Sequence, residues 1–185
     1  EEKTIADVLE RTRLFVDEII VVNDGSSDRT AQIAKSKNVI VVSHVINRGL
    51  GAAIGTGFDA ALKFGADMVV TLDADGQHDP SEIPKFVSAI QGGADTVIGS
   101  RMLNPSGMPW FRRVANRLGN LVTLFLFGAH VTDSQSGFRA FNKFALKKIK
   151  IRTNRMEVSS ELIAESKVHK LNLVEVPIKA IYTDY

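Results

Sequence analysis

Cysteine is absent from the 185 residues. Its absence excludes disulfide bonds, thiolate-bound metals and a cysteine nucleophile, and it is compatible with a reducing compartment. A strong excess of one charge is also absent, because 23 Lys and Arg stand against 21 Asp and Glu, giving a net charge of +2. Without a strong global field, the composition gives no reason to expect nucleic acid as a partner.

Long hydrophobic runs are absent too. The longest, residues 121–127, is interrupted by Thr123 and falls far short of the roughly 20 residues that cross a bilayer. We therefore expect no transmembrane segment in this chain. Residues 1–4 show none of the charged, apolar and small-residue regions of a signal peptide. Because the chain starts without Met and stops without a terminating element, we expect both ends to continue into something longer.

The composition, 44% apolar and 24% charged, is typical of one globular domain. Strands are predicted at four β-rich runs, residues 18–22, 39–43, 68–72 and 96–100, and helices at residues 4–12, 28–36, 51–64 and 80–91. Continuously apolar strands separated by helices indicate an α/β fold with a mainly parallel sheet covered by helices on both faces. Ligands bind such sheets outside the carboxyl ends of the strands.

The second half of the chain has a different pattern. We expect a basic amphipathic stretch, a polar loop, a short helix, a longer helix and a last strand, at residues 109–127, 132–139, 143–149, 159–169 and 173–182. No internal repeat or low-complexity linker separates the halves. The prediction is therefore one domain, residues 1–185, with distinct halves at about 1–101 and 102–185.

Two carboxylates follow the third predicted strand, in the segment Asp73-Ala74-Asp75. In an extended segment, Asp73 and Asp75 would share one face about 6 to 7 Å apart. Acids that close raise each other's pKa, a cost that a bound divalent cation reverses. Gln77 adds a neutral oxygen, and an all-oxygen set suits Mg²⁺ or Mn²⁺. The pattern predicts a metal site, with solvated loop acids as the alternative.

Asp24 lies at the tip of the first predicted strand, where its carboxylate could accept hydrogen bonds from a nucleoside. Just beyond it, Ser27 or Asp28 can cap the following helix. The segment from Asn47 to Gly49 opens another helix, where glycine allows close approach of a ligand or a strand.

Several common nucleotide and metal motifs are missing. The pattern G-x-G-x-x-G fails because Ile54 stands at the third glycine position after Gly49 and Gly51, and no P-loop sequence occurs. An EF-hand counted from Asp73 fails at its sixth position, which is His78 rather than Gly. The four histidines lack metal-ligand spacing, so we expect no catalytic role for them.

The motifs N-D-G-S-S-D, N-R-G-x-G-x-A, D-A-D-G-Q-H, G-S-R and D-S-Q-S-G-F-R occur in this order over nearly the whole chain. Together they resemble family 2 of the inverting glycosyltransferases with the GT-A fold, and more narrowly the dolichyl-phosphate mannose or glucose synthases. The resemblance implies a nucleotide-sugar-binding first half, an acceptor-facing second half, and a missing first strand, of whose terminal motif only Glu1 or Glu2 remains.

The same resemblance assigns residues to the donor side of the site. It implies that Asp24 contacts the nucleoside and Asp73 the ribose or a metal-linked water, and that Asp75 and Gln77 bind the metal on the diphosphate. The donor pocket would be completed by Glu2, Asn47, Gly49 and Ala74. Charge builds on the departing diphosphate, so a divalent cation with a nearby arginine would stabilise it.

Arginines define the expected acceptor side. A guanidinium fork binds phosphate in a bidentate manner, so Arg101 and Arg139 are candidates for the acceptor phosphate and, with Asp73 and Asp75, for catalysis. Pairing with a surface carboxylate is the alternative for both arginines. The predicted acceptor site also includes Arg112, Arg113, Asp133 and Ser136. Asp133 would be the general base for a hydroxyl acceptor, or otherwise order the loop of residues 132–139.

The segment 110–121 combines an apolar stripe with a face rich in Arg and Asn. This pattern predicts an amphipathic helix that lies on a membrane surface or covers the sheet. The resemblance implies transfer of mannose or glucose, from GDP-mannose or UDP-glucose, to dolichyl or polyprenyl phosphate at the cytoplasmic face of a membrane. Two alternatives stay open: transfer to a sugar hydroxyl, and a non-catalytic module that binds a nucleotide sugar or a lipid surface.

Overall fold

The computed structural model describes residues 1–103, 131–179 and 181. Its first half contains α1 (Ile5–Thr12), β1 (Ile20–Asn23), α2 (Thr30–Lys35), β2 (Ile40–Ser43), α3 (Leu50–Lys63), β3 (Met68–Thr71), η1 (Pro80–Glu82), α4 (Ile83–Gln91) and β4 (Thr96–Ser100). The second half contains β5 (Arg139–Asn142), α6 (Lys143–Lys148), α7 (Val158–Val168) and β6 (Leu173–Pro177). The four strands predicted in the first half are confirmed.

Sequence patterns missed or misplaced three features. The predicted helix at residues 80–91 is divided into η1 and α4, each with a proline in its first turn, where the missing N–H costs nothing. The last strand ends at Pro177, and the described residues beyond it, 178, 179 and 181, are not in a strand, whereas the prediction extended to residue 182. Strand β5 was missed because it has only 4 residues and begins and ends with polar side chains.

The strands form two sheets. Strands β1 and β2 pair in parallel, with Ile20 opposite Ile40. The other sheet has the order β3-β5-β4-β6, in which β4 and β6 are parallel and β5 runs antiparallel to both of its neighbours. The prediction of an α/β fold is therefore confirmed, with β5 as the exception to parallel pairing.

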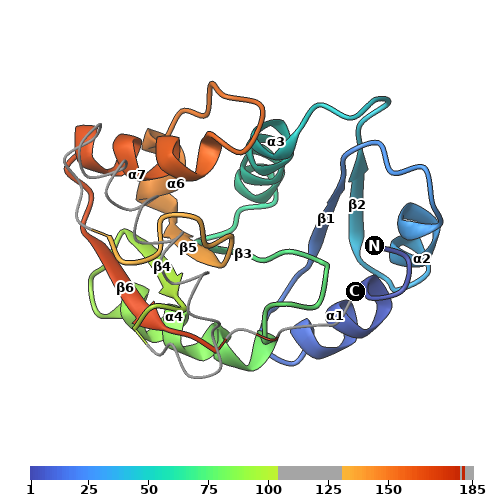
Figure 1. Ribbon diagram of the computed structural model, residues 1–185, viewed down its shortest axis with the longest axis horizontal. Helices are drawn as coiled ribbons and strands as arrows, with labels where there is room; N and C mark the ends of the chain where they lie inside the picture. Colours follow the sequence, from blue (N-terminus) through green and yellow to red (C-terminus); the bar gives the residue numbers. More distant parts are fainter. Residues whose placement is uncertain (104–130, 180, 182–185) are drawn as a thin grey trace.

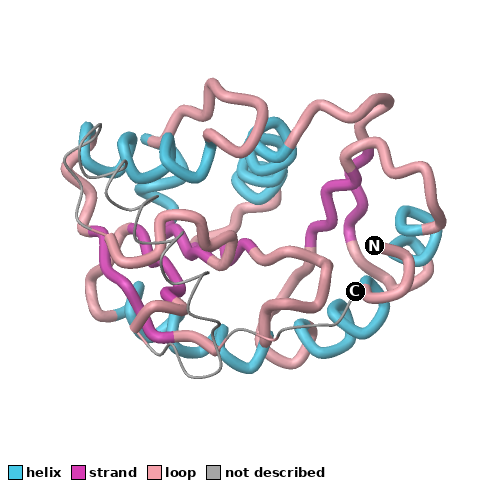
Figure 2. Tube along the Cα trace, viewed as in Figure 1, coloured by secondary structure: helices cyan, strands magenta, loops and turns pink. Residues whose placement is uncertain are grey.

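Among the described residues, β1 and β3 each keep one edge that pairs with no other strand. Figures 1 and 2 show that β1, rather than β2, lies on the side facing β3. A further strand could hydrogen-bond to both edges. The first strand that the family resemblance expects before Glu1 remains a prediction.

Helices cover both faces of the four-stranded sheet, with α4 on one side and α3, α6 and α7 on the other (Figure 1). On the α4 side, the rings of Phe86 and Phe138 stack with their centroids 4.4 Å apart. On the opposite side, Phe58 meets Phe141 edge to face at 4.9 Å. Every residue of β4 is buried, including the small polar residues Thr96 and Ser100 at its two ends. None of the helices that the structure describes combines the length and apolarity needed to cross a bilayer.

Candidate active site

Polar side chains follow the ends of three strands. Asp24 comes directly after β1, Asp73 two residues after β3, and Arg101 directly after β4. The carboxyl ends of the strands of an α/β sheet form the usual ligand-binding edge. The structure thus places these predicted site residues where the fold binds ligands.

Residues 73–78 form a turn after β3. Asp75 Oδ1 accepts a hydrogen bond from the backbone N–H of Gln77 at 2.8 Å, and Gly76 between them has a φ of 80°. The prediction of an extended segment with strict alternation is therefore wrong for Asp73 and Asp75, because β3 has already ended at Thr71. The two carboxylates nevertheless remain close enough to interact electrostatically.

Asp73 lies against a glycine of the opposite loop. A Cβ added at Gly137 would lie 2.6 Å from Asp73 Oδ2, so only glycine leaves room for this carboxylate. Loss of hydration in this crowded position raises the pKa of Asp73. His78, Arg101 and Arg139 oppose that rise, whereas the neighbouring Asp75 carboxylate adds to it. Half of the Asp73 side chain remains exposed.

His78 fixes the base of the turn. Its Nδ1 accepts a hydrogen bond from the backbone N–H of Asp73 at 3.2 Å, and its ring lies 5.1 Å from that of Phe138. Burial lowers the pKa of His78, although Asp73 and Asp75 pull in the opposite direction. Because Nδ1 accepts, a neutral imidazole carries its proton on Nε2.

Arg101 and Asp133 form a bidentate ion pair at the end of β4. Arg101 Nε donates to Asp133 Oδ2 at 2.7 Å and Nη2 donates to Oδ1 at 2.8 Å. The Asp133 side chain is fully buried, whereas the Arg101 side chain is 25% exposed. The carboxylate therefore holds the guanidinium at the edge of the site, and Asp133 is not free to act as an accessible base.

Glu175 on β6 holds Asp133 in turn. Its carboxylate accepts from the backbone N–H of Thr132 at 2.9 Å and from that of Asp133 at 3.2 Å. The Thr132 hydroxyl donates to the same carboxylate at 3.0 Å. A chain of contacts therefore runs from Glu175 through Asp133 to Arg101. Sequence reasoning missed Glu175, and its position in a partly buried strand was the only available signal.

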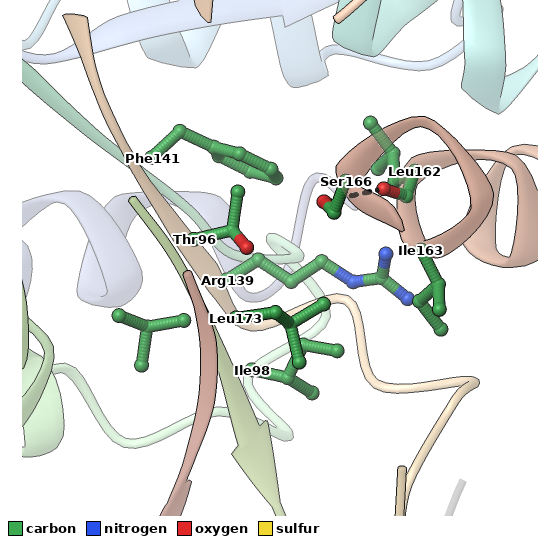
Figure 3. A pocket seen from close by; sticks show the side chains of 9 residues that line it. Thr96, Ile98, Arg139, Phe141, Leu162, Ile163, Ser166 and Leu173 are labelled. Carbon is green, nitrogen blue, oxygen red and sulfur yellow. Dashed lines mark hydrogen bonds between the residues drawn. The ribbon is translucent and has the colours of Figure 1, made fainter. Parts of the chain in front are cut away.

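The position of Arg139 contradicts the prediction that it contacts the acceptor phosphate. Arg139 begins β5, is 3% exposed, and donates to the backbone carbonyls of Ser134, Ser136 and Ser159 at 2.7, 2.8 and 3.0 Å. Its side chain extends from β5 toward α7 beside a small void of ≈10 Å³ (Figure 3). These contacts occupy the guanidinium, so Arg139 orders the loop rather than offering itself to an acceptor phosphate.

Electrostatics are consistent with this buried role. Burial lowers the pKa of Arg139 to about 10, while the negative charges of Asp133 and Asp73 counteract the shift. The group thus stays cationic at neutral pH. Ser136, another predicted acceptor contact, is fully buried, which contradicts direct contact with an acceptor in this arrangement.

Asp24 organises the donor side of the site. Its carboxylate accepts hydrogen bonds from the backbone N–H groups of Arg48 and Gly49 at 2.8 and 2.7 Å, and it lies 2.6 Å from His44 Nδ1. The other ring nitrogen of His44 lies 2.9 Å from the hydroxyl of Thr56 on α3. Burial alone would raise the pKa of Asp24, but these hydrogen bonds outweigh it and lower the pKa.

Other predicted donor residues have contacts of their own. Glu2 accepts from the backbone and side chain of Arg29 at 3.1 and 3.3 Å. The backbone carbonyl of Ala74 accepts from the Thr4 hydroxyl at 2.6 Å. Asp28 accepts from the Thr30 N–H at 3.0 Å, which confirms the expected role at the start of α2. Sequence patterns did not indicate the contacts of Glu2 and Ala74, because each joins segments that are distant in sequence.

An open recess of ≈330 Å³ adjoins the Asp24 loop. It is lined by Asn47, Arg48, Gly49, Leu50, Arg155 and Met156, and we call it the arginine recess. The structure therefore brings Asn47 and Gly49 to a cavity, as their assignment to the donor pocket expects, although the contact with donor remains a prediction. Arg112 and Arg113 lie outside the described residues.

Metal binding would depend on the turn after β3. Within residues 1–103, 131–179 and 181, no three His, Asp or Glu side chains are gathered as a metal centre. Asp73 and Asp75 would supply two acidic ligands, and a bound cation would offset the repulsion and desolvation that raise the pKa of Asp73. The donor set fits Mg²⁺ or Mn²⁺, with Gln77 and ligand oxygens available to complete it.

Sequence comparisons agree with this geometry. A family model described as glycosyl transferase family 2 matches residues 1–150. A UDP-N-acetylglucosamine–dolichyl-phosphate N-acetylglucosaminyltransferase of Methanococcus voltae is 41% identical, with 100% of this chain and 83% of that protein aligned. A polyprenol monophosphomannose synthase of Mycolicibacterium smegmatis is 38% identical over 71% of this chain and 53% of its own length.

Solved structures show the same fold. Glucosyl-3-phosphoglycerate synthase from Mycobacterium tuberculosis, in complex with Mn²⁺, uridine diphosphate and glucosyl-3-phosphoglycerate, gives a TM-score of 0.76 at 21% sequence identity. The superposition covers 100% of this chain and 69% of that chain. At this identity the likeness supports the GT-A architecture alone. Because the family model and the relatives agree over most of the sequence, the chain belongs to glycosyl transferase family 2 and is a glycosyltransferase.

Proposed function

We propose that the full-length protein transfers a hexose, with inversion, from a nucleotide-diphosphate sugar to dolichyl or another polyprenyl phosphate. The observation that carries the proposal is the meeting of the Asp73–Asp75 turn with the Arg101–Asp133 pair at the carboxyl ends of β3 and β4. The names of the relatives from M. voltae and M. smegmatis support a polyprenyl phosphate acceptor.

The donor would lie across the carboxyl ends of β1 and β3. Asp24 holds the backbone of Arg48 and Gly49 in place, and this loop would line the nucleoside end of the donor pocket, with the diphosphate extending toward the turn at Asp73. A divalent cation bound there would offset charge on the diphosphate. Asp73 and Asp75 would hold that cation, while Arg101 adds a positive charge fixed by Asp133.

The acceptor phosphate is already an anion at neutral pH, so its attack on the sugar needs no general base. This agrees with a fully buried Asp133 that is engaged by Arg101. Transfer to a sugar hydroxyl would need an accessible base, and the ion pair therefore supports the phosphate acceptor over the hydroxyl. The assay below identifies the donor, because it compares mannose, glucose and N-acetylglucosamine as sugars and guanine and uracil as bases.

The test is a transfer assay on the full-length protein with labelled GDP-mannose, UDP-glucose or UDP-N-acetylglucosamine, Mn²⁺ and a short polyprenyl phosphate. We expect labelled lipid with one donor, and a rate at least roughly 100-fold lower for Asp75→Asn, because loss of an electrostatic stabiliser costs this much in comparable sites. The matched control is Asp59→Asn, since Asp59 is exposed on α3.

Transfer only to free sugars, and not to the lipid, would refute the acceptor assignment. Full activity of Asp75→Asn would refute the role of the turn. Because the proposed acceptor is embedded in a bilayer, we place the full-length enzyme at the cytoplasmic face of a membrane, where nucleotide sugars are available.

A further inference from the structure

Two loops come together at one end of the molecule. The loop of residues 44–49 follows β2, and the loop of residues 150–157 precedes α7; Figure 1 shows both at the same end, near α3. The backbone N–H of Gly51 donates to Asn154 O at 3.0 Å. A Cβ at Gly49 would lie 2.1 Å from the same oxygen, so the two loops touch through backbone.

Large apolar side chains project from both loops. Val45 is 100% exposed, its neighbour Ile46 is 69% exposed, and Met156 on the other loop is 62% exposed. Single exposed apolar residues are ordinary, but Val45 and Ile46 are neighbours on one loop, and Met156 lies on the loop that touches it.

The two loops also carry an excess of cations. The two loops carry Arg48, Lys150, Arg152 and Arg155, against Glu157 as their one acid. Arg48 and Arg155 line the arginine recess, which opens beside Met156. Arg152 is 73% exposed. A surface that alternates exposed apolar side chains with arginine matches the interface of an anionic bilayer, where tails and phosphates lie a few ångströms apart.

Each loop is held by one partly buried acid. Asp24 binds the N–H groups of Arg48 and Gly49. Glu161 of α7 accepts from the N–H groups of Arg152 and Thr153 at 2.9 and 3.0 Å, and from the Thr153 hydroxyl at 2.6 Å. The loops are therefore ordered before any partner arrives, which lowers the entropic cost of docking.

We propose that the loops of residues 44–49 and 150–157 form a docking surface for an anionic lipid bilayer. Val45, Ile46 and Met156 enter the interfacial region, and Arg48 and Arg155 contact lipid phosphates. The inference deepens the proposed function, because docking there would bring a lipid-bound acceptor to the edge of the donor pocket.

The test is vesicle sedimentation with the 185-residue chain, which keeps any other membrane segment of a longer protein out of the assay. Wild type should bind vesicles of mixed phosphatidylcholine and phosphatidylglycerol. The double variant Val45→Ser/Ile46→Ser should bind roughly tenfold more weakly, because it removes apolar burial of the order of 1.4 kcal/mol. The double variant Arg48→Gln/Arg155→Gln should lose the preference for the anionic lipid.

Matched controls are Leu14→Ser, at a side chain 77% exposed elsewhere, and Lys147→Gln on the exposed face of α6. Both should bind as wild type does. Equal binding by wild type and the Val45/Ile46 variant, or no binding by wild type, would overturn the docking surface. If the wild-type chain did not bind vesicles, a protein partner would be the alternative for these exposed side chains.

An activity assay keeps this failure separate from failure of the proposed function. In detergent, with a short polyprenyl phosphate, the full-length Val45→Ser/Ile46→Ser protein should retain wild-type transfer, because no bilayer needs to be engaged. Loss of its activity there would overturn a role confined to docking. Absence of lipid transfer by wild type in the same assay would overturn the proposed function instead.

Discussion

The two sheets of this molecule are built differently. All residues of β4 are buried, whereas β1 and β2 consist mainly of half-buried residues. The four-stranded sheet has helices on both faces and stacked phenylalanines in its core. The two-stranded sheet is joined to it through α3, which contacts both β1 and β3. Because β4 and the phenylalanine core belong to the four-stranded sheet, we expect that sheet to contribute most of the stability.

The turn at Asp73 lies where the two parts meet. Ala74 packs against the apolar cluster of α1 and α2 and accepts a hydrogen bond from Thr4. Asp73 itself contacts Gly137 beside β5. The candidate site therefore depends on both parts, and variants in each should affect it differently.

The largest expected effect is on the stability of the four-stranded sheet. Phe138→Ala should lower the free energy of unfolding by about 3–5 kcal/mol, because it leaves a cavity beside Phe86. Val41→Ala in the half-buried β2 should cost only about 1 kcal/mol. Urea unfolding of both variants measures the difference. Equal losses would contradict the contrast between the sheets.

Arg139→Met tests the buried arginine. Its removal leaves the carbonyls of Ser134, Ser136 and Ser159 without their donor, which should cost roughly 1–3 kcal/mol in unfolding free energy. Arg139→Lys should recover only part of the loss, since an ammonium cannot reproduce the planar fork. Unchanged stability accompanied by weaker acceptor binding would instead restore the original prediction of phosphate contact.

Asp73→Asn should stabilise the protein at neutral pH while abolishing transfer. Because the folded-state pKa of Asp73 is raised above its ordinary value of 3.8, ionisation favours the unfolded state as pH rises through that range. The gain in Tm should be present at pH 7 and should disappear below pH 3.8, where the carboxyl is protonated in both states. Thermal unfolding at both pH values checks this.

Mn²⁺ provides the complementary measurement. It should raise the Tm of wild type, because the ion binds the Asp73 carboxylate in the folded state. It should leave the Tm of Asp73→Asn unchanged, because the amide carries no charge to attract the ion. An equal Mn²⁺ shift in both proteins would place the ion elsewhere.

The smallest expected effect concerns His44. His44→Ala should raise the donor KM up to about tenfold with little change in kcat, because one hydrogen bond to Asp24 is lost. His44→Asn should restore much of the affinity, since its amide can donate in place of Nδ1. Steady-state kinetics with varied donor measures the split, and a fall in kcat alone would exclude a positioning role.

Sequence patterns predicted the first half well because each of its four strands has an apolar, β-branched centre. They also found the strand-end positions of Asp24, Asp73 and Arg101. They could not show which partners those side chains meet. The pairing of Arg101 with Asp133 joins residues 32 positions apart, and no local spacing encodes it.

Two misses have clear physical reasons. Arg139 was assigned to a phosphate because a guanidinium is usually exposed. Here two carbonyls of the preceding loop and that of Ser159 on α7 accept its hydrogen bonds inside the protein. His44 and His78 were set aside for lacking metal-ligand spacing, although both organise acids of the site through single ring nitrogens. Such roles depend on tertiary contacts rather than on motif.

The contact between Gly137 and Asp73 has a mechanical consequence. Because Gly137 has no side chain, the backbone of its loop lies directly against the Asp73 carboxylate. No flexible side chain lies between them that could move aside if the loop shifted inward. A displacement of residues 133–137 toward β3 would therefore be transmitted directly to the Asp73 carboxylate and the turn that carries it.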